Sequence, residues 1–381
     1  MQDALGLTAA ENAWLDRHGF ARGAFLPLAA RLRAGELTSE HNRLKARVEA
    51  PAPEDLAHWP TPDTATARSC DERGRQAIAA GTVAAVILNG GMATRFGGVV
   101  KGVVDVDAGR SFLALKLRDL AEQPGPVEVF ILCSFATRSD TERHLASIHF
   151  AGVDRARVHL LEQSSAPRLT PTGELFRDAR GELSPYAPGH GDVFPALTDS
   201  PAYQAFVRRG GKTIVVSNVD NLGATLSPTV LGAHLASGKP CTVELAEKLA
   251  GDAGGAPARV DGRLEIVEGF RFPRDFDART IPVFNTNTLW LETSHVRGDF
   301  PLQWFRADKE VGGRPAVQLE RLMGEVTHFV DAHYLVVPRT GPVGRFLPVK
   351  APADLDVIRQ EVRTRWPARP NDAHAPSIGD P

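Results

Sequence analysis

Residues 83–102 read VAAVILNGGMATRFGGVVKG, and this stretch decides the fold. Val83 to Leu88 form an unbroken apolar run rich in β-branched residues, which is typical of a parallel strand buried on both faces. The run leads directly into a glycine-rich turn. In open α/β sheets small ligands bind in the crevice beyond the carboxyl ends of the strands, where glycines let backbone amides approach phosphate oxygens. We therefore expect an anion, and specifically a phosphate ester, beside the cations Arg95 and Lys101.

Beyond this turn the chain alternates strand and helix patterns. Strands are expected at 83–88, 127–134, 157–163, 213–218 and 241–247, with helices near 111–123, 137–146, 202–208 and 228–236. Asp261-Gly262 lies between two alternating runs and predicts a hairpin, and 284–291 and 330–337 are expected to be further strands. The fold class is therefore α/β, with a doubly wound, mostly parallel mixed sheet of Rossmann-like type.

The first 80 residues are expected to be a helical N-terminal segment followed by a proline-rich connector. Thr8 with Glu11 predicts a capping box, Ser69 with Glu72 predicts the start of a third helix, and residues 49–64 contain four prolines. Residues 81–364 are then expected to form the main α/β domain. The proline-rich stretch 365–381 is expected to be a disordered tail.

Composition excludes several classes of protein. The chain has 381 residues, 43% hydrophobic and 24% charged, with a formal net charge of -2, so no general attraction to nucleic acid or membranes is expected. The N-terminal residues contain no basic leader followed by an apolar core, and no apolar stretch is long enough to span a bilayer. The three cysteines have no metal-type spacing. We expect a cytoplasmic protein with reduced thiols.

The glycine-rich loop is neither the dinucleotide fingerprint nor a Walker loop, because it lacks G-x-G-x-x-G and its Lys101 is not preceded by glycine and followed by Ser or Thr. It resembles the nucleotide-binding loop of the sugar-nucleotide pyrophosphorylases, G-G-x-G-T-x-x-G with a lysine shortly after. From about residue 44 to 359, further segments resemble, in order, the eukaryotic-type UDP-glucose pyrophosphorylase family: EQSSAPR (162–168), PGHGDVF (188–194), SNVDNLGATL (217–226) with FNTNTLW (284–290), and GRFLPVK (344–350). AVQLERLMG (316–324) is similar to a helix of that family.

The resemblance implies a nucleotide-diphospho-sugar transferase-like fold and a set of site residues. Nucleotide contacts are implied for Leu88, Asn89, Gly90, Gly91, Lys101, Gln163, Gly189, Asn218, Val219 and Asp220. In this scheme Gln163 reads uracil, and Asp220 also holds Mg²⁺. Sugar-phosphate contacts are implied for His190, Asn285 and Asn287, and the catalytic cations are Lys101 on the triphosphate and Lys350 on the α-phosphate.

Each of these side chains has an ordinary structural alternative. Asp220 could cap the turn after its strand, Lys350 could be a solvated strand end, and His190 could hydrogen-bond its own turn. Asn285 and Asn287 are expected on one side of a strand, although asparagines there are also common turn formers. The sequence departs from the family pattern at Ala93, Val100 and Ala253, and its loop is one residue short.

The implied reaction is the Mg²⁺-assisted in-line attack of a hexose 1-phosphate on the α-phosphate of UTP, which gives a UDP-sugar and pyrophosphate. Glucose 1-phosphate is the expected acceptor. UDP-N-acetylhexosamine synthesis, broad specificity and a non-catalytic nucleotide-sugar-binding regulator are open alternatives. Family members continue into a C-terminal β-helical domain that mediates assembly, whereas this chain has only a short tail, so a monomer is expected.

Overall fold

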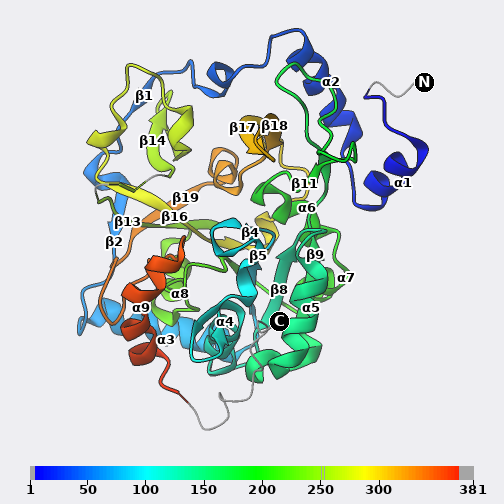
Figure 1. Cartoon of the computed structure of the whole chain (residues 1–381). Helices are drawn as coiled ribbons and strands as arrows, with labels where there is room; N and C mark the ends of the chain where they lie inside the picture. Colours follow the sequence, from blue (N-terminus) through cyan, green and yellow to red (C-terminus); the bar gives the residue numbers. More distant parts are fainter. Residues whose placement is uncertain (1–4, 250, 253, 369–381) are drawn as a thin grey trace.

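The computed structural model describes residues 5–249, 251–252 and 254–368 (Figure 1). Its centre is an eight-stranded sheet in the order β2-β19-β13-β16-β12-β3-β8-β9. β16 runs antiparallel to both neighbours and the other pairs are parallel, which confirms the predicted mixed, mostly parallel sheet. The strands are β2 (Leu56–His58), β19 (Ala332–Val336), β13 (Cys241–Glu247), β16 (Val283–Glu292), β12 (Thr213–Asn218), β3 (Val83–Leu88), β8 (Glu128–Cys133) and β9 (Val158–Glu162).

Apolar side chains of β3 alternate between two separate cores, because successive residues of a strand point to opposite faces. Val83, Ala85 and Ile87 face the first core, which contains α3 (Ala65–Ala79), α4 (Phe112–Ala121), α5 (Arg138–Ser147), α8 (Pro228–Ser237) and α9 (Pro352–Arg365). Ala84, Val86 and Leu88 face the second, which contains α6 (Val193–Thr198), α7 (Pro201–Arg208) and the hairpin of β14 (Ala256–Val260) and β15 (Arg263–Val267). All six β3 residues are buried, as a doubly covered sheet requires.

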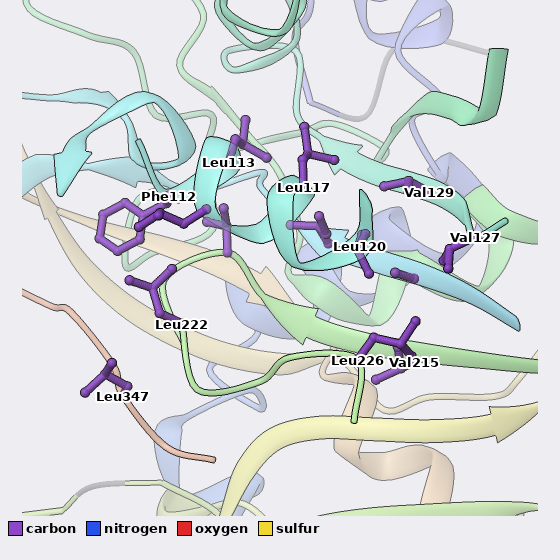
Figure 2. Packing of buried hydrophobic residues seen from close by; sticks show 14 of the residues in the cluster. Phe112, Leu113, Leu117, Leu120, Val127, Val129, Val215, Leu222, Leu226 and Leu347 are labelled. Carbon is purple, nitrogen blue, oxygen red and sulfur yellow. The ribbon is translucent and has the colours of Figure 1, made fainter. Parts of the chain in front are cut away.

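The first core also anchors two loops that matter for the site. Figure 2 shows apolar side chains of α4 beside residues from other segments: Val127, Val129, Val215, Leu222, Leu226 and Leu347. Leu222 and Leu226 follow β12, and Leu347 belongs to the segment that precedes α9. Leu222 lies between α4 and Leu347 in Figure 2, and its N–H donates to the Leu347 carbonyl at 3.2 Å, so the two loops lie side by side.

The N-terminal helices α1 (Ala9–Arg17) and α2 (Arg22–Arg33) form a third, smaller core with two antiparallel pairs of strands. These pairs are β10 (Ala166–Pro167) with β11 (Pro185–Tyr186), and β17 (Phe305–Val311) with β18 (Arg314–Glu320). The capping box of Thr8 and Glu11 is confirmed. The predicted start of the third helix is wrong, because Thr64 caps α3 and Ser69 lies inside it. α3 packs on the main sheet rather than with α1 and α2.

Three other expectations need correction. The connector 49–64 is not only extended chain, because its residues 56–58 form β2 at the edge of the sheet. Residues 316–324 are not a helix, because they complete β18 and enter a 3₁₀ turn, Met323–His328. Trp366 is buried against α9 and its neighbours, so packing extends past the predicted boundary at 364. The rest of the predicted tail, 369–381, lies outside the described residues.

The hairpin at Asp261-Gly262 is confirmed, with both residues at positive φ as a two-residue turn of this kind requires. The glycine-rich loop is different from a simple strand-to-helix turn. It folds back as a short ribbon of β4 (Met92–Ala93) and β5 (Val99–Val100), and α4 starts only after a second ribbon, β6 (Asp105–Asp107) with β7 (Arg110–Ser111). β1 (Val48–Glu49) adds to the β14–β15 hairpin. No helix in the described part of the chain has the length and apolar character to cross a bilayer.

Candidate active site

A cavity of about 170 Å³ opens where β12 ends and the first half of β16 passes beside it. Six of the predicted site residues line this cavity: His190, Asn218, Asp220, Asn285, Asn287 and Lys350. They come from four segments that are far apart in the sequence. A larger cavity of about 630 Å³ lies between β9, α5 and α7, and none of the predicted residues lines it.

Asp220 follows the last residue of β12 and is half-buried at the cavity wall. The Lys101 ammonium forms a salt bridge with its carboxylate. The backbone N–H of Lys101 donates to the Gly91 carbonyl at 3.4 Å. Lys101 therefore joins the glycine-rich loop, through this hydrogen bond, to the Asp220 loop, through the salt bridge. The predicted phosphate-binding cation and the predicted metal ligand therefore already face each other.

A network of buried hydrogen bonds between residues 220–221 and 345–349 holds Lys350 opposite Asp220. The Asn221 side chain accepts from the Leu347 N–H at 2.9 Å and donates to the Arg345 carbonyl at 3.2 Å. The Val349 N–H donates to the Asp220 carbonyl at 3.0 Å. The Arg345 guanidinium is 2% exposed and binds the fully buried Glu244 carboxylate of β13 through two nitrogens, at 2.6 and 2.8 Å. The segments SNVDNLGATL and GRFLPVK are thus two halves of one structure.

Lys350 itself is exposed at the mouth of the cavity. Its ammonium forms no salt bridge or hydrogen bond with any residue in the described ranges, whereas its backbone N–H donates to Asp354 at the start of α9. A cation with a fixed backbone and no hydrogen-bonded partner is available to an anionic ligand in the cavity.

Gln163 lies just after β9 and is 6% exposed. Its Nε2 donates to the Gly189 carbonyl at 2.9 Å, and its Oε1 lies beside Gly90, where an added Cβ would be 1.9 Å away. Gly189 has φ +95°, and a Cβ there would lie 2.5 Å from the Arg321 carbonyl oxygen. Close packing therefore requires a glycine at both positions, at Gly90 against the Gln163 amide and at Gly189 against the Arg321 backbone.

His190 is held as a neutral donor. The backbone N–H of Met323 donates to its Nδ1 at 3.0 Å, so the ring proton resides on Nε2. Burial lowers the pKa of His190 to about 4, because the surroundings cannot solvate an imidazolium. At neutral pH the ring therefore offers an N–H to an acceptor in the cavity, which suits a phosphate or hydroxyl oxygen.

Asn285 and Asn287 reach the cavity by a different route from the expected strand alternation. A bulge shifts the register of β13 and β16 after Asn285, and Asn287 has φ +60°. The Asn285 side-chain oxygen accepts the Asn287 N–H at 2.9 Å, and the Asn287 Nδ2 donates to the Asn218 side-chain oxygen at 2.9 Å. The bulge therefore brings the side-chain amides of Asn218, Asn285 and Asn287 together on one wall of the cavity.

Other predicted residues do not line the cavity. Asn89 is fully buried, and its amide donates to Thr141 and accepts the Gly102 N–H, so it holds the loop in shape. Leu88 and Val219 are also buried and are joined by a backbone hydrogen bond. Ala253 lies outside the described residues. Any contact of these residues with a nucleotide stays a prediction.

Several cavity residues were missed from the sequence. Glu268 lines the cavity, its carboxylate makes no hydrogen bond or salt bridge within the described part of the chain, and burial raises its pKa against the opposing effect of the Arg271 guanidinium. The rings of Phe284 and Phe346 also line it and pack edge to face at 4.9 Å, with the Arg339 guanidinium over both. Phe284 and Phe346 lie in the segments FNTNTLW and GRFLPVK, whereas near Glu268 only the preceding hairpin was predicted, and the packing of that hairpin decides the contact with the cavity.

The fold and the cavity define an α/β protein built on an open, mostly parallel sheet, with polar groups and cations gathered beyond the carboxyl end of a central parallel strand. The chain belongs to the UTP–glucose-1-phosphate uridylyltransferase family, whose model matches residues 34–365.

Curated relatives carry the same description. The chain is 32% identical over 305 residues to the UTP–glucose-1-phosphate uridylyltransferase of Saccharomyces cerevisiae, covering 74% of this chain and 60% of the relative. It is 29% identical over 318 residues to that of Solanum tuberosum, covering 76% and 65%. The chain therefore spans about three fifths of the length of these relatives.

Solved structures share the fold. A mutant of the Leishmania major UDP-glucose pyrophosphorylase in complex with UDP-glucose matches with a TM-score of 0.69 and 26% identity, covering 92% of this chain and 79% of that one. The uridine diphosphate N-acetylglucosamine pyrophosphorylase of Trypanosoma brucei matches with a TM-score of 0.77 and 22% identity, covering 95% and 82%.

Proposed function

We propose that the protein is a uridylyltransferase that forms a UDP-sugar and pyrophosphate from UTP and a hexose 1-phosphate. The observation that carries this proposal is the convergence of His190, Asp220, Asn285 and Lys350 on one cavity. Family membership and the names of the relatives support UTP and glucose 1-phosphate as the substrates.

Nucleotidyl transfer of this type needs no protein nucleophile. The sugar phosphate oxygen attacks the α-phosphorus and pyrophosphate leaves, so the protein contributes orientation and neutralisation of charge. Lys350, whose ammonium is exposed at the cavity, would stabilise charge on the α-phosphate, and Lys101 would bind the triphosphate after leaving Asp220. The His190 Nε2–H would donate to the sugar phosphate.

The residues present fit a magnesium ion that arrives with the nucleotide. The described residues contain no group of three histidine, cysteine or acidic side chains arranged to hold a metal, and Asp220 is the carboxylate that contacts the phosphate-binding lysine. Mg²⁺ usually takes one or two carboxylates and completes its shell with phosphate and water, so Asp220 alone suits it. When bound, it would neutralise charge on the phosphate oxygens.

The hexose would lie against the amide wall of Asn218, Asn285 and Asn287. Glu268 lines the same cavity as Asn285 and has unused hydrogen-bonding capacity, so it would bind sugar hydroxyls. Aromatic rings of Phe284 and Phe346 close the cavity. These groups suit a polyhydroxylated ring, and the relatives' names favour glucose as its identity.

The test is incubation of the protein with UTP, Mg²⁺ and glucose 1-phosphate, with released pyrophosphate as the readout. Turnover that EDTA abolishes supports the proposal. A parallel panel of galactose, mannose and N-acetylglucosamine 1-phosphates defines the acceptor. Absence of pyrophosphate release with every sugar, together with measurable UDP-glucose binding by calorimetry, would show a non-catalytic binding protein instead.

A further inference from the structure

Asp192 is a buried carboxylate outside the cavity wall that none of the roles above uses. It is 1% exposed and lies at the end of the segment PGHGD, two residues after His190. Its Oδ2 accepts the Ser164 backbone N–H at 2.9 Å and also the Ser164 hydroxyl, and its Oδ1 binds the Arg321 guanidinium. One side chain therefore joins three segments of the chain.

The Ser164 contact acts directly on Gln163. Ser164 is the next residue, so the carboxylate holds the peptide group that connects the two. The Gln163 side chain is then positioned between the Gly189 carbonyl and Gly90, with no space to move toward Gly90. A displacement of the 164 backbone would therefore change the direction of the Gln163 amide.

The Arg321 contact acts on the loop that contains Gly189 and His190. The Arg321 backbone donates to the Pro188 carbonyl at 2.7 Å and accepts the Gly191 N–H at 3.0 Å. Its guanidinium stacks on Trp304, 4.6 Å from the ring centroid. Two residues later, the Met323 N–H binds His190. The backbone of Arg321 thus holds the loop 188–191 in place. Asp192 binds both Arg321 and Ser164, and so connects this loop to the Gln163 segment.

Net stability is a poor explanation for such a pair. Burying a carboxylate and a guanidinium costs desolvation free energy that their attraction repays only in part, so apolar replacements of buried pairs are often no less stable. Buried ion pairs are better attested as devices that fix the register of segments. Here the fixed register is that of Gln163 against the loop 188–191.

We propose that Asp192 is a positioning residue that sets the base selectivity of the nucleotide site by holding Gln163 and the loop 188–191 in register. The inference rests on the proposed function, because it takes Gln163 to be the residue that reads uracil. Uracil presents a donor between two acceptors, so a misdirected amide would lose discrimination against cytosine, whose corresponding edge differs.

The experiment compares kcat/KM for UTP and CTP in wild type and Asp192→Asn. The variant is isosteric and can still accept from Ser164, but it loses the ion pair with Arg321. We expect the preference for UTP over CTP to fall at least about tenfold, mainly through the KM for UTP. Glu128→Gln is the matched control, because Glu128 is 6% exposed, pairs with Arg157 and Arg209, and lies at the opposite end of β8 from the site.

A double variant distinguishes positioning from an independent contribution. If Asp192 acts through Gln163, Asp192→Asn adds no further loss of preference to Gln163→Ala. Unchanged preference in a folded Asp192→Asn, or additive losses in the double variant, would overturn the inference. Should Asp192→Asn not fold, Ser164→Ala removes one hydrogen bond to the same carboxylate, and an unchanged preference there would overturn it as well.

The outcome for wild type separates this inference from the proposed function. A wild-type protein that shows no preference between UTP and CTP, in turnover or in calorimetric binding, contradicts both. A wild-type preference that Asp192→Asn retains contradicts the positioning role alone. Thermal unfolding of each variant accompanies the kinetics, and we expect Glu128→Gln to lower Tm without changing the UTP to CTP ratio.

Discussion

The two ends of the candidate site are built in different ways. Around Gln163 the side chain is buried, hydrogen-bonded to the Gly189 carbonyl and confined by Gly90. Around Lys350 the backbone is fixed by the buried hydrogen bonds between residues 220–221 and 345–349. The ammonium is exposed and has no hydrogen-bonded partner among the described residues. Lys101 and Asp220, between the two ends, neutralise each other.

Under the proposed function, the group that would read the base is therefore ordered before the ligand arrives, whereas the Lys350 ammonium would gain its hydrogen-bonded partner only from the ligand. A preorganised polar site discriminates strongly, because a wrong base leaves buried groups unpaired. Cations on fixed backbones can instead stabilise the charge that develops on phosphate oxygens. Selectivity and rate should therefore be separable by mutation.

The largest effect is expected for Lys350→Ala. Loss of one preorganised cation at the α-phosphate should cost about 3 kcal/mol in the transition state, which is roughly a hundredfold in kcat. The ratio of kcat/KM for UTP and CTP should not change, because Gln163 is untouched. Lys239→Ala, an exposed lysine paired with Asp331, is the control. Full turnover by Lys350→Ala would remove this residue from the mechanism.

An intermediate effect is expected for Gly90→Ala. The new methyl group would occupy the position of the Gln163 Oε1, so the amide must turn away. We expect the variant to match Gln163→Ala, with a loss of about 2 kcal/mol, or roughly thirtyfold, in the preference for UTP over CTP. Gly23→Ala in α2 is the control, because nothing lies within 4 Å of a Cβ there and the residue is not part of the site. A selective Gly90→Ala variant would show that uracil is read elsewhere.

The smallest effect is expected for His190, which follows Gly189 in the chain and lines the same cavity as Lys350. Its pKa is about 4 in the folded protein and about 6.5 in the unfolded chain, so the unfolded chain binds more protons between these values. This contribution to stability is complete above about pH 6.5 and is lost as the pH falls toward about 4. Between about pH 7 and 5.5 the wild type should lose about 1 kcal/mol more than His190→Gln in urea unfolding. Equal losses would show that the histidine is not held neutral.

Much of the fold could be predicted because the signals are local. The apolar run of β3, the Asp261-Gly262 turn and the Thr8 capping box each lie within a few residues. The failures have physical causes too. Residues 316–320 form a strand because β17 offers a partner, and Ser69 lies inside α3 because Thr64, five residues earlier, caps the helix.

The candidate site was predicted unevenly for the same reason. Asp220, His190 and Lys350 lie in recognisable segments, and the structure brings them to one cavity. Glu268 lies in no such segment, and its place in the wall depends on the packing of the β14–β15 hairpin. The roles of all these residues stay predictions until they are measured.

The sequence by itself determined the order of strands and helices, the sheet type and the family, since these depend on short-range patterns and on segments that keep their order along the chain. Only the tertiary structure decided which groups meet. The pairing of Lys101 with Asp220, the bulge at Asn287 and the bridge from Asp192 to Ser164 and Arg321 join positions up to about 130 residues apart. Such contacts follow from the register of packed elements, and no local pattern of residues encodes that register.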